Sequence, residues 1–192
     1  MDTVKKLSLP CSDEELRSLK CGDELLLYGE LYTARDAAHS KLCQLIEEGE
    51  ALPFDLRGAA IYYTGPTPPR EGEAIGSAGP TTSSRMDAYT PMLLLRGLRV
   101  MIGKGNRSVE VVREMVKNGA VYLGATGGAG ALLSRRIVDA RCCAFEELGT
   151  EAVYRLEVEV FPVTVVIDCR GENLYETGPK EYLAANKKPG EK

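Results

Sequence analysis

The sequence contains no tryptophan and a single histidine, His39, so few imidazole groups are available to bind a metal ion. Six cysteines are present, but none forms a Cys-x-x-Cys pair, the spacing typical of zinc and iron–sulfur sites. We therefore do not expect a complete metal site within this chain. In a reducing compartment, scattered cysteines of this kind remain buried or incidental free thiols. The six are Cys11, Cys21, Cys43, Cys142, Cys143 and Cys169.

Long apolar runs are also lacking. No stretch is long enough to cross a bilayer, and residues 1–6 lack the apolar core of a secretion signal. The formal net charge of −4 argues against general affinity for nucleic acid, whose phosphates require clustered cations. We expect a cytoplasmic protein that binds neither nucleic acid nor membrane. A locally cationic pocket is compatible with this charge.

The chain is long and apolar enough for one sizeable domain, since it has 192 residues with 44% hydrophobic content. We predict a single domain over residues 1–183 and a loose polar tail over residues 184–192. Alternating helical and strand patterns predict an α/β fold. Helices are expected after the capping box at residues 12–15 and over residues 33–48, 92–96, 109–118 and 131–136. Strands are expected over residues 24–32, 59–64, 98–102, 120–124, 137–145, 156–160 and 164–168.

Two of these helices carry explicit start and stop signals. Thr33 with Asp36 is predicted to open the second helix, and Gly49 is placed to end it. Thr90 and Pro91 are predicted as the cap and the first position of the next helix.

Three short runs gather cations and hydroxyl groups where helices are predicted to begin. They are Thr-Ala-Arg-Asp-Ala-Ala-His at residues 33–39, Gly-Pro-Thr-Thr-Ser-Ser-Arg-Met-Asp at residues 79–87 and Gly-Lys-Gly-Asn-Arg-Ser at residues 103–108. Backbone N–H groups at a helix start attract anions, and arginine can hold a carboxylate with two hydrogen bonds. The pattern predicts a site for a small dicarboxylic acid.

Arg35 and His39 lie four residues apart, so both project from one face of the predicted helix near its start. One ligand could contact both side chains. The residues alone favour a simpler interpretation, in which Arg35 pairs with Asp36 or another neighbour and His39 borders the apolar stripe of the helix.

The segment at residues 65–84 is dense in Gly, Pro, Thr and Ser and is too long for a plain connection, which makes it a candidate functional loop. The segment contains Thr81 and leads directly to Arg85, although Thr81 could also be an ordinary turn residue. Lys104 follows a predicted strand between Gly103 and Gly105, which allow a sharp turn and a close approach to a ligand. A plain turn with a solvated lysine explains this position equally well.

The glycine-rich turn at residues 124–130 does not form the Gly-x-Gly-x-x-Gly pattern of dinucleotide sites. Close packing of a helix against the sheet explains it better. Glu147 and Glu151 are predicted to act in capping or ion pairs rather than in catalysis, and a role in the pocket for the Glu-Leu-Gly-Thr-Glu-Ala run at residues 147–152 is the alternative.

The three runs resemble the iron–sulfur hydro-lyase family, in particular the β subunit, or fused C-terminal domain, of class I fumarate hydratase and L(+)-tartrate dehydratase. The resemblance extends from Gly22-Asp23 to Phe161-Pro162. It implies a swivelling β/β/α domain and a [4Fe-4S] cluster whose cysteine ligands belong to a separate α subunit. The cluster's open iron would then act as a Lewis acid on the substrate, in an assembly expected to be α2β2.

The resemblance also assigns roles to residues. Thr81 matches the threonine proposed in that family as the base for the C3 proton of malate, and Arg35, His39, Arg85 and Lys104 match substrate-binding positions. A threonine hydroxyl is a weak acid, so its alkoxide would need nearby cations and a desolvated pocket. No metal ligand is expected in this chain.

Three functions remain open at this stage. The Lys-Gly-Asn-Arg run at residues 104–107 favours fumarate over tartrate, because tartrate dehydratases typically have the sequence Lys-Gly-Gly-Met at the corresponding turn. Ser83-Ser84 departs from the Ala-Gly or Pro-Gly typical of class I fumarases but leaves Thr81 and Arg85 in place. A non-catalytic regulatory module that binds a carboxylate or a phosphate is the alternative from another class.

Overall fold

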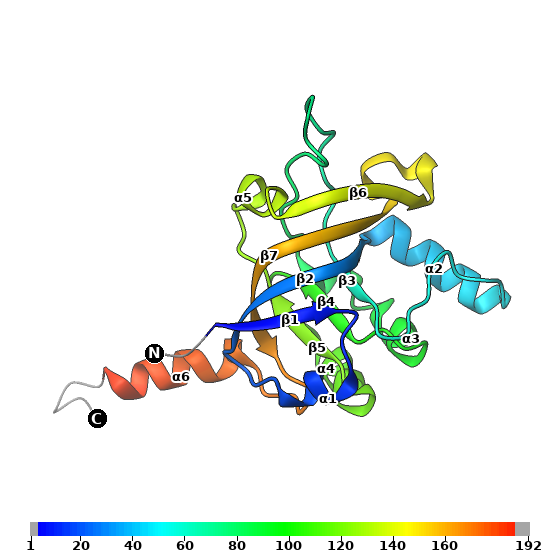
Figure 1. The fold of residues 1–192 in the computed structure, drawn as a ribbon. Coiled ribbons are helices and arrows are strands. Elements are labelled where there is room, and N and C mark those ends of the chain that lie inside the picture. The colour runs from blue at the N-terminus through cyan, green and yellow to red at the C-terminus, as the bar shows by residue number, and fades with distance from the viewer. Residues whose placement is uncertain (1–3, 187–192) are drawn as a thin grey trace.

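The computed structural model describes residues 4–186. Its seven strands form one sheet, and five of them close into a ring (Figure 1). Four neighbouring strands of the ring, β2, β3, β4 and β5, run parallel to one another. The long strand β7 pairs antiparallel with both β5 and β2, which closes the ring. The strands are β1 (Lys5–Leu9), β2 (Glu24–Thr33), β3 (Ala60–Tyr62), β4 (Val100–Gly103), β5 (Val121–Gly124), β6 (Ile137–Ala144) and β7 (Val153–Ile167).

The two remaining strands extend this ring at its sides. β1 pairs parallel with the first half of β2, and β3 then takes over the same edge of β2 at Tyr32 and Thr33. In the same way, β6 pairs with the first half of β7 and β5 with its last residues. The two longest strands, β2 and β7, thus each pair with two strands along one edge and with each other along the opposite edge.

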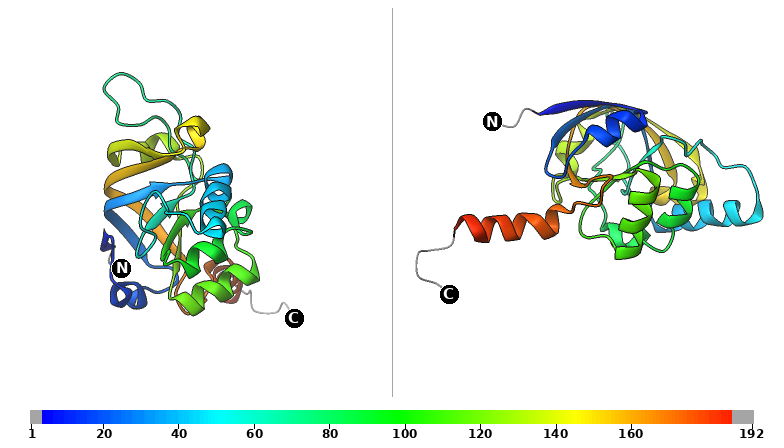
Figure 2. Two further views of the ribbon diagram at one scale, coloured as in Figure 1. Left: turned by 90° about the vertical axis from the view of Figure 1, so that its right-hand side faces the viewer. Right: turned by 90° about the horizontal axis from the view of Figure 1, so that it is seen from below.

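Helices cover one side of the parallel strands (Figure 2). α3 and α4 contact each other, whereas α6 extends away from the body of the protein. The helices are α1 (Asp13–Ser18), α2 (Asp36–Glu48), α3 (Thr90–Leu95), α4 (Val109–Asn118), α5 (Gly130–Ser134) and α6 (Leu174–Ala185), with 3-10 turns η1 (Ser83–Met86) and η2 (Glu146–Glu151).

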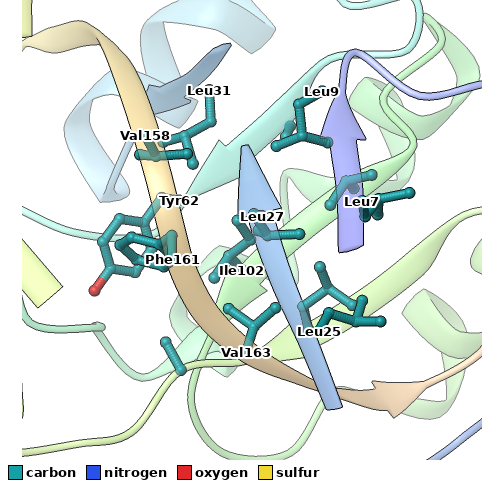
Figure 3. Packing of buried hydrophobic residues seen from close by; sticks show 14 of the residues in the cluster. Leu7, Leu9, Leu25, Leu27, Leu31, Tyr62, Ile102, Val158, Phe161 and Val163 are labelled. Atoms are coloured by element: carbon teal, nitrogen blue, oxygen red, sulfur yellow. The ribbon is translucent and has the colours of Figure 1, made fainter. Parts of the chain in front are cut away.

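A first apolar core fills the inside of the ring (Figure 3). Leucines of β1 and β2 meet side chains of β3, β4 and β7, and the rings of Tyr62 and Phe161 pack edge to face at 5.4 Å between centroids. Burying a leucine such as Leu27 stabilises the fold by about 2 kcal/mol.

A second core lies between the outer faces of β3, β4 and β5 and the helices α2, α3 and α4. Because these short strands are covered on both faces, nearly all of their residues are buried and their sequences read as continuous apolar runs. The predicted α/β class is confirmed.

Several local predictions are also confirmed. Ser12 and Glu15 form the capping box of α1, α4 spans the predicted residues, and Gly49 ends α2 in the left-handed conformation. The sequence analysis missed β1 and α6. The predicted tail at residues 184–192 begins within α6, which continues through Ala185, and its residues 187–192 lie outside the described part of the chain.

Two strand predictions need correction, because residues 156–160 and 164–168 belong to the single strand β7. Val160 has a φ of 54°, and Pro162 lies where one edge of β7 has no strand partner, between the pairing with β6, which ends at Val158, and that with β5, which begins at Thr164. Proline is tolerated in strands at such positions.

The predicted helix starts at Thr33 and Thr90 were wrong. Thr33 is the last residue of β2, and its hydroxyl group donates to the Ala152 carbonyl and accepts from the Tyr154 amide, so it is not available to cap α2. Thr90 already lies within α3, and its hydroxyl donates to the Met86 carbonyl.

Among residues 4–186, no helix is long and apolar enough to cross a membrane.

Candidate functional site

The predicted site residues lie at the carboxyl ends of the parallel strands. Arg35 follows β2, Gly65 follows β3 and Lys104 follows β4 directly. Since β2, β3 and β4 are parallel neighbours, these ends meet at one edge of the sheet. This edge is where α/β folds bind ligands.

Thr81 is held against the ends of β3 and β4 by backbone hydrogen bonds. Its N–H donates to the Tyr63 carbonyl at 2.6 Å, and its carbonyl accepts from the Lys104 N–H at 3.3 Å. The Ser83 N–H then donates to the Lys104 carbonyl at 2.8 Å, and Thr82 and Lys104 form a parallel bridge. The end of the long loop therefore runs as a short extra strand beside Lys104, which places Thr81 next to it.

Arg85 is directed by Asp36, the first residue of α2. The Arg85 Nε donates to Asp36 Oδ1 at 2.9 Å, and Nη2 lies 2.8 Å from Oδ2. This contact uses one edge of the guanidinium and leaves Nη1 and the outer N–H of Nη2 for another acceptor. Because the Arg85 side chain is 49% exposed, that outer edge is accessible to a ligand.

Arg35 lies in a tighter position between two carboxylates. Its Nη2 is 3.2 Å from Glu151 Oε1, and its Nε is 3.8 Å from Asp36 Oδ2. That Nε is buried and has no hydrogen-bond acceptor within the described residues, a recurrent feature of functional sites. Gly65 makes this position possible, since a Cβ there would lie 2.7 Å from the Arg35 Nη1 and 3.0 Å from the Thr150 carbonyl oxygen.

His39 is fully buried beneath Arg35 rather than exposed beside it. Its Nδ1 lies 2.9 Å from the Arg35 carbonyl oxygen, and its ring packs edge-on against Tyr63. Burial lowers the pKa of His39 to about 4, although the Arg35 carbonyl and Asp36 act in the opposite direction, so the ring is neutral at physiological pH. Its burial does not support the direct contact with a ligand that the sequence analysis predicted.

Lys104 is exposed at the end of β4, and within residues 4–186 it has no carboxylate partner. Its side chain lies along the glycine-rich turn, where a Cβ on Gly127 would be 3.5 Å from Lys104 Cδ and 3.8 Å from Nζ. This small residue leaves room for the lysine side chain. An ammonium group without a counterion is available to a ligand carboxylate.

Glu147 and Glu151 act as predicted, in ion pairs and capping. Glu151 accepts a hydrogen bond from the Ala37 N–H at 3.0 Å and thereby caps α2 from a distant part of the chain. Glu147 forms an exposed ion pair with Lys41. The start of α4 is similarly occupied, because the Ser108 N–H donates to Asp87 Oδ2 at 2.7 Å. Acidic side chains of the protein itself thus bind amide groups at the starts of α2 and α4, which leaves the cations as the candidate anion-binding groups.

Few donor groups for a metal ion lie together in the described part of the chain. In the described ranges, no three His, Cys, Asp or Glu side chains are grouped as ligands, and the six cysteines are free. Burial raises the pKa of Cys11 and of Cys43 to about 11, and nearby Glu15 and Glu47 respectively act in the same direction, which disfavours the thiolate forms that bind metals. Residues 4–186 therefore do not fit an iron–sulfur cluster.

The fold and the site define an α/β domain whose cations gather at the carboxyl ends of its parallel strands. The family model described as "Fumarase C-terminus" matches residues 2–178. The chain belongs to the fumarase C-terminus family.

Relatives of two lengths are similar to the chain. Fumarate hydratase 2 of Leishmania major is 42% identical over 164 residues, which is 84% of this chain and 29% of that protein. The aerobic class I fumarate hydratase of Escherichia coli is 39% identical over 164 residues, 84% of this chain and 30% of that protein. The chain thus spans about a third of these enzymes. The putative L(+)-tartrate dehydratase subunit beta of Methanocaldococcus jannaschii is 38% identical over 169 residues, 85% of this chain and 87% of that protein.

Proposed function

We propose that the chain is the β subunit of a heteromeric class I fumarate hydratase, which interconverts fumarate and (S)-malate. Support comes from the family membership and from one structural observation: Lys104 lies beside the Thr81 backbone at one edge of the sheet, and Arg85, four residues after Thr81, is joined to Arg35 through Asp36. Three cations in this arrangement suit a dicarboxylate dianion.

In this proposal the cations bind and orient the two carboxylates, and Thr81 moves the proton at C3. The outer edge of Arg85 would bind one carboxylate by a two-pronged contact, with Asp36 holding the guanidinium in place. Lys104 lies next to the Thr81 backbone and would favour its transient alkoxide electrostatically. The neutral His39 ring contacts the Arg35 carbonyl oxygen through Nδ1 and would thereby help to hold the Arg35 backbone in place.

An α subunit is the partner that the proposal requires. Class I enzymes of this kind carry a [4Fe-4S] cluster, and we assign its ligands to that partner, since the described residues of this chain offer no suitable ligand set. The swivelling β/β/α description of the fold, an α2β2 assembly and a cytoplasmic location with free thiols belong to the same proposal.

L(+)-tartrate dehydratase is the second candidate, because a relative with that name, a subunit beta, is matched over 87% of its own length. Anaerobic co-expression with a cysteine-bearing α subunit, followed by assays on malate, fumarate and tartrate, distinguishes the candidates. We expect activity on malate and fumarate only in the assembled enzyme. Faster turnover of tartrate would favour the second candidate. A chain that binds a carboxylate or phosphate alone, with no activity after assembly, would be a regulatory module.

A further inference from the structure

Arg107 is the most completely buried cation described in the structure, with none of its side chain exposed. Its Nε donates to Asp87 Oδ1 at 2.7 Å, Nη2 donates to Thr90 Oγ1 at 2.7 Å, and Nη1 donates to the Tyr63 hydroxyl at 3.2 Å. Tyr63 and Tyr122 present their rings to the guanidinium, each at 5.3 Å from ring centroid to Cζ. Arg107 therefore cannot contact a substrate directly.

Two of the partners of Arg107, Asp87 and Tyr63, lie beside proposed site residues. Asp87 is two residues beyond Arg85, and its second carboxylate oxygen accepts from the Ser108 N–H. The Tyr63 carbonyl accepts a hydrogen bond from the Thr81 N–H. Arg107 itself follows Lys104 in the turn after β4. The guanidinium thus links the turn that carries Lys104 to the segment that carries Thr81 and Arg85, and both of these to the end of β3.

Tyr122 adds a second link between the same segments. Its buried hydroxyl donates to the Gly105 carbonyl at 2.9 Å and lies 2.9 Å from the Ser83 Oγ, which can donate in return. Gly103 permits this approach, since a Cβ there would lie only 2.0 Å from the Ser83 Oγ. The contact joins the Lys104 turn to the residues after Thr81.

We propose that Arg107 is a positioning residue, which with Tyr122 fixes the Lys104 turn against the segment of Thr81 and Arg85. A buried, fully hydrogen-bonded cation suits this task because its partners have fixed directions and few alternative arrangements. The role rests on the proposed function, in which Thr81 and Lys104 must be aligned on one substrate. Small misplacements of such groups reduce rates steeply.

The test compares Arg107→Lys and Tyr122→Phe in the assembled enzyme with Arg113→Lys, a matched change at an exposed arginine of α4. Arg107→Lys keeps a charge near Asp87 but loses the other contacts, so we expect kcat to fall about tenfold or more while KM changes by less than about threefold. Tyr122→Phe should show a smaller loss of the same kind, and Arg113→Lys none. In a Lys104→Ala background, Arg107→Lys should add little further loss, because both changes affect the same alignment.

Amide hydrogen exchange of the chain alone gives a readout that does not depend on activity. The N–H groups of Thr81, Ser83 and Lys104, which join the two segments, should exchange faster in Arg107→Lys and Tyr122→Phe, with Arg113→Lys as the reference. If the wild-type assembly lacks dehydratase activity, the proposed function fails and exchange alone decides the positioning role. Should Arg107→Lys not fold, Tyr122→Phe decides it. Wild-type kcat together with wild-type exchange at these three amides in the folded variants would overturn the proposal.

Discussion

At the scale of single residues, the site depends on cations whose directions are set by neighbouring carboxylates. Asp36 directs Arg85, Glu151 and Asp36 flank Arg35, and Lys104 alone among the three has no carboxylate partner within the described residues. Arginine is suited to the first two positions because one edge can be held by the protein while the other binds a ligand.

Thr81 is the residue whose proposed role is easiest to test. Thr81→Ala removes the hydroxyl without disturbing the backbone hydrogen bonds that hold the segment, so we expect kcat of the assembled enzyme to fall about a hundredfold or more. Thr81→Ser should retain part of the rate. Turnover and exchange of the malate C3 proton with deuterated solvent measure both effects. Thr82→Ala, at the exposed neighbour, is the control, and unimpaired exchange in Thr81→Ala would exclude Thr81 as the base.

Arg85→Lys tests the two-pronged contact. A lysine cannot hold Asp36 and a substrate carboxylate together, so we expect kcat/KM to fall about tenfold to a hundredfold with the fold intact. Arg57→Lys changes another exposed arginine that contacts an aspartate, Asp55, away from the site, and should have no effect on activity. Equal kinetics of the two variants would remove Arg85 from the site.

At the scale of elements, α2 is unusual because its first turn is capped by a glutamate from η2. The Arg35 side chain makes no cap hydrogen bond, and Glu151 supplies the carboxylate that accepts from the Ala37 amide. The same carboxylate lies beside Arg35, so the start of the helix and the position of a proposed substrate-binding residue depend on one side chain.

We therefore expect Glu151→Ala to lower the free energy of unfolding by about 1–2 kcal/mol, the range for a lost helix cap with a partly buried charge. Glu151→Gln keeps an acceptor and should cost less. Glu147→Ala, in the same element η2, breaks only an exposed ion pair with Lys41 and should cost clearly less than Glu151→Ala. Urea unfolding measures all three, and equal losses for Glu151→Ala and Glu147→Ala would show that the cap contributes nothing.

At the scale of the whole molecule, stability should depend on pH through the one histidine of the chain. Burial lowers the pKa of His39 from 6.5 to about 4, so between these values the unfolded chain binds a proton that the folded chain does not. The free energy of unfolding therefore falls as pH drops below about 6.5, by about 1.4 kcal/mol per pH unit and about 2 kcal/mol in total at pH 5.

Denaturant unfolding at about pH 7.5, 6 and 5 measures this loss, with NMR titration of the imidazole as a direct check. His39→Gln should remove the dependence above pH 5, whatever its own effect on stability. A His39 signal that titrates near its ordinary value in the folded protein would contradict the prediction.

The sequence predicts those parts of the fold that are specified locally. The capping box of α1, the glycine end of α2 and the whole of α4 depend on residues within a turn or two of each other. The single strand β7 could not be predicted, because its tolerance of Pro162 depends on where β6 stops and β5 begins.

The candidate site divides in the same way. Thr81, Arg85 and Lys104 were predicted from their motifs, whereas the burial of His39 and the contact of Asp36 with Arg85 depend on segments that are distant in the sequence. Arg107 lay within an identified motif, yet nothing in its local sequence distinguishes a buried linking cation from a surface one. Its partners Tyr63, Asp87 and Tyr122 come from three other segments.

The closure of the ring by β7 also sets an order of events during synthesis. β2 leaves the ribosome early, but one of its edges is completed only by residues 155–164, and α2 receives its cap from a residue 114 positions downstream. Until that last strand emerges, the nascent chain presents an open strand edge that other chains can pair with. The closed ring must therefore form after most of the chain has been made. A chain interrupted before Val153 would retain an aggregation-prone strand edge.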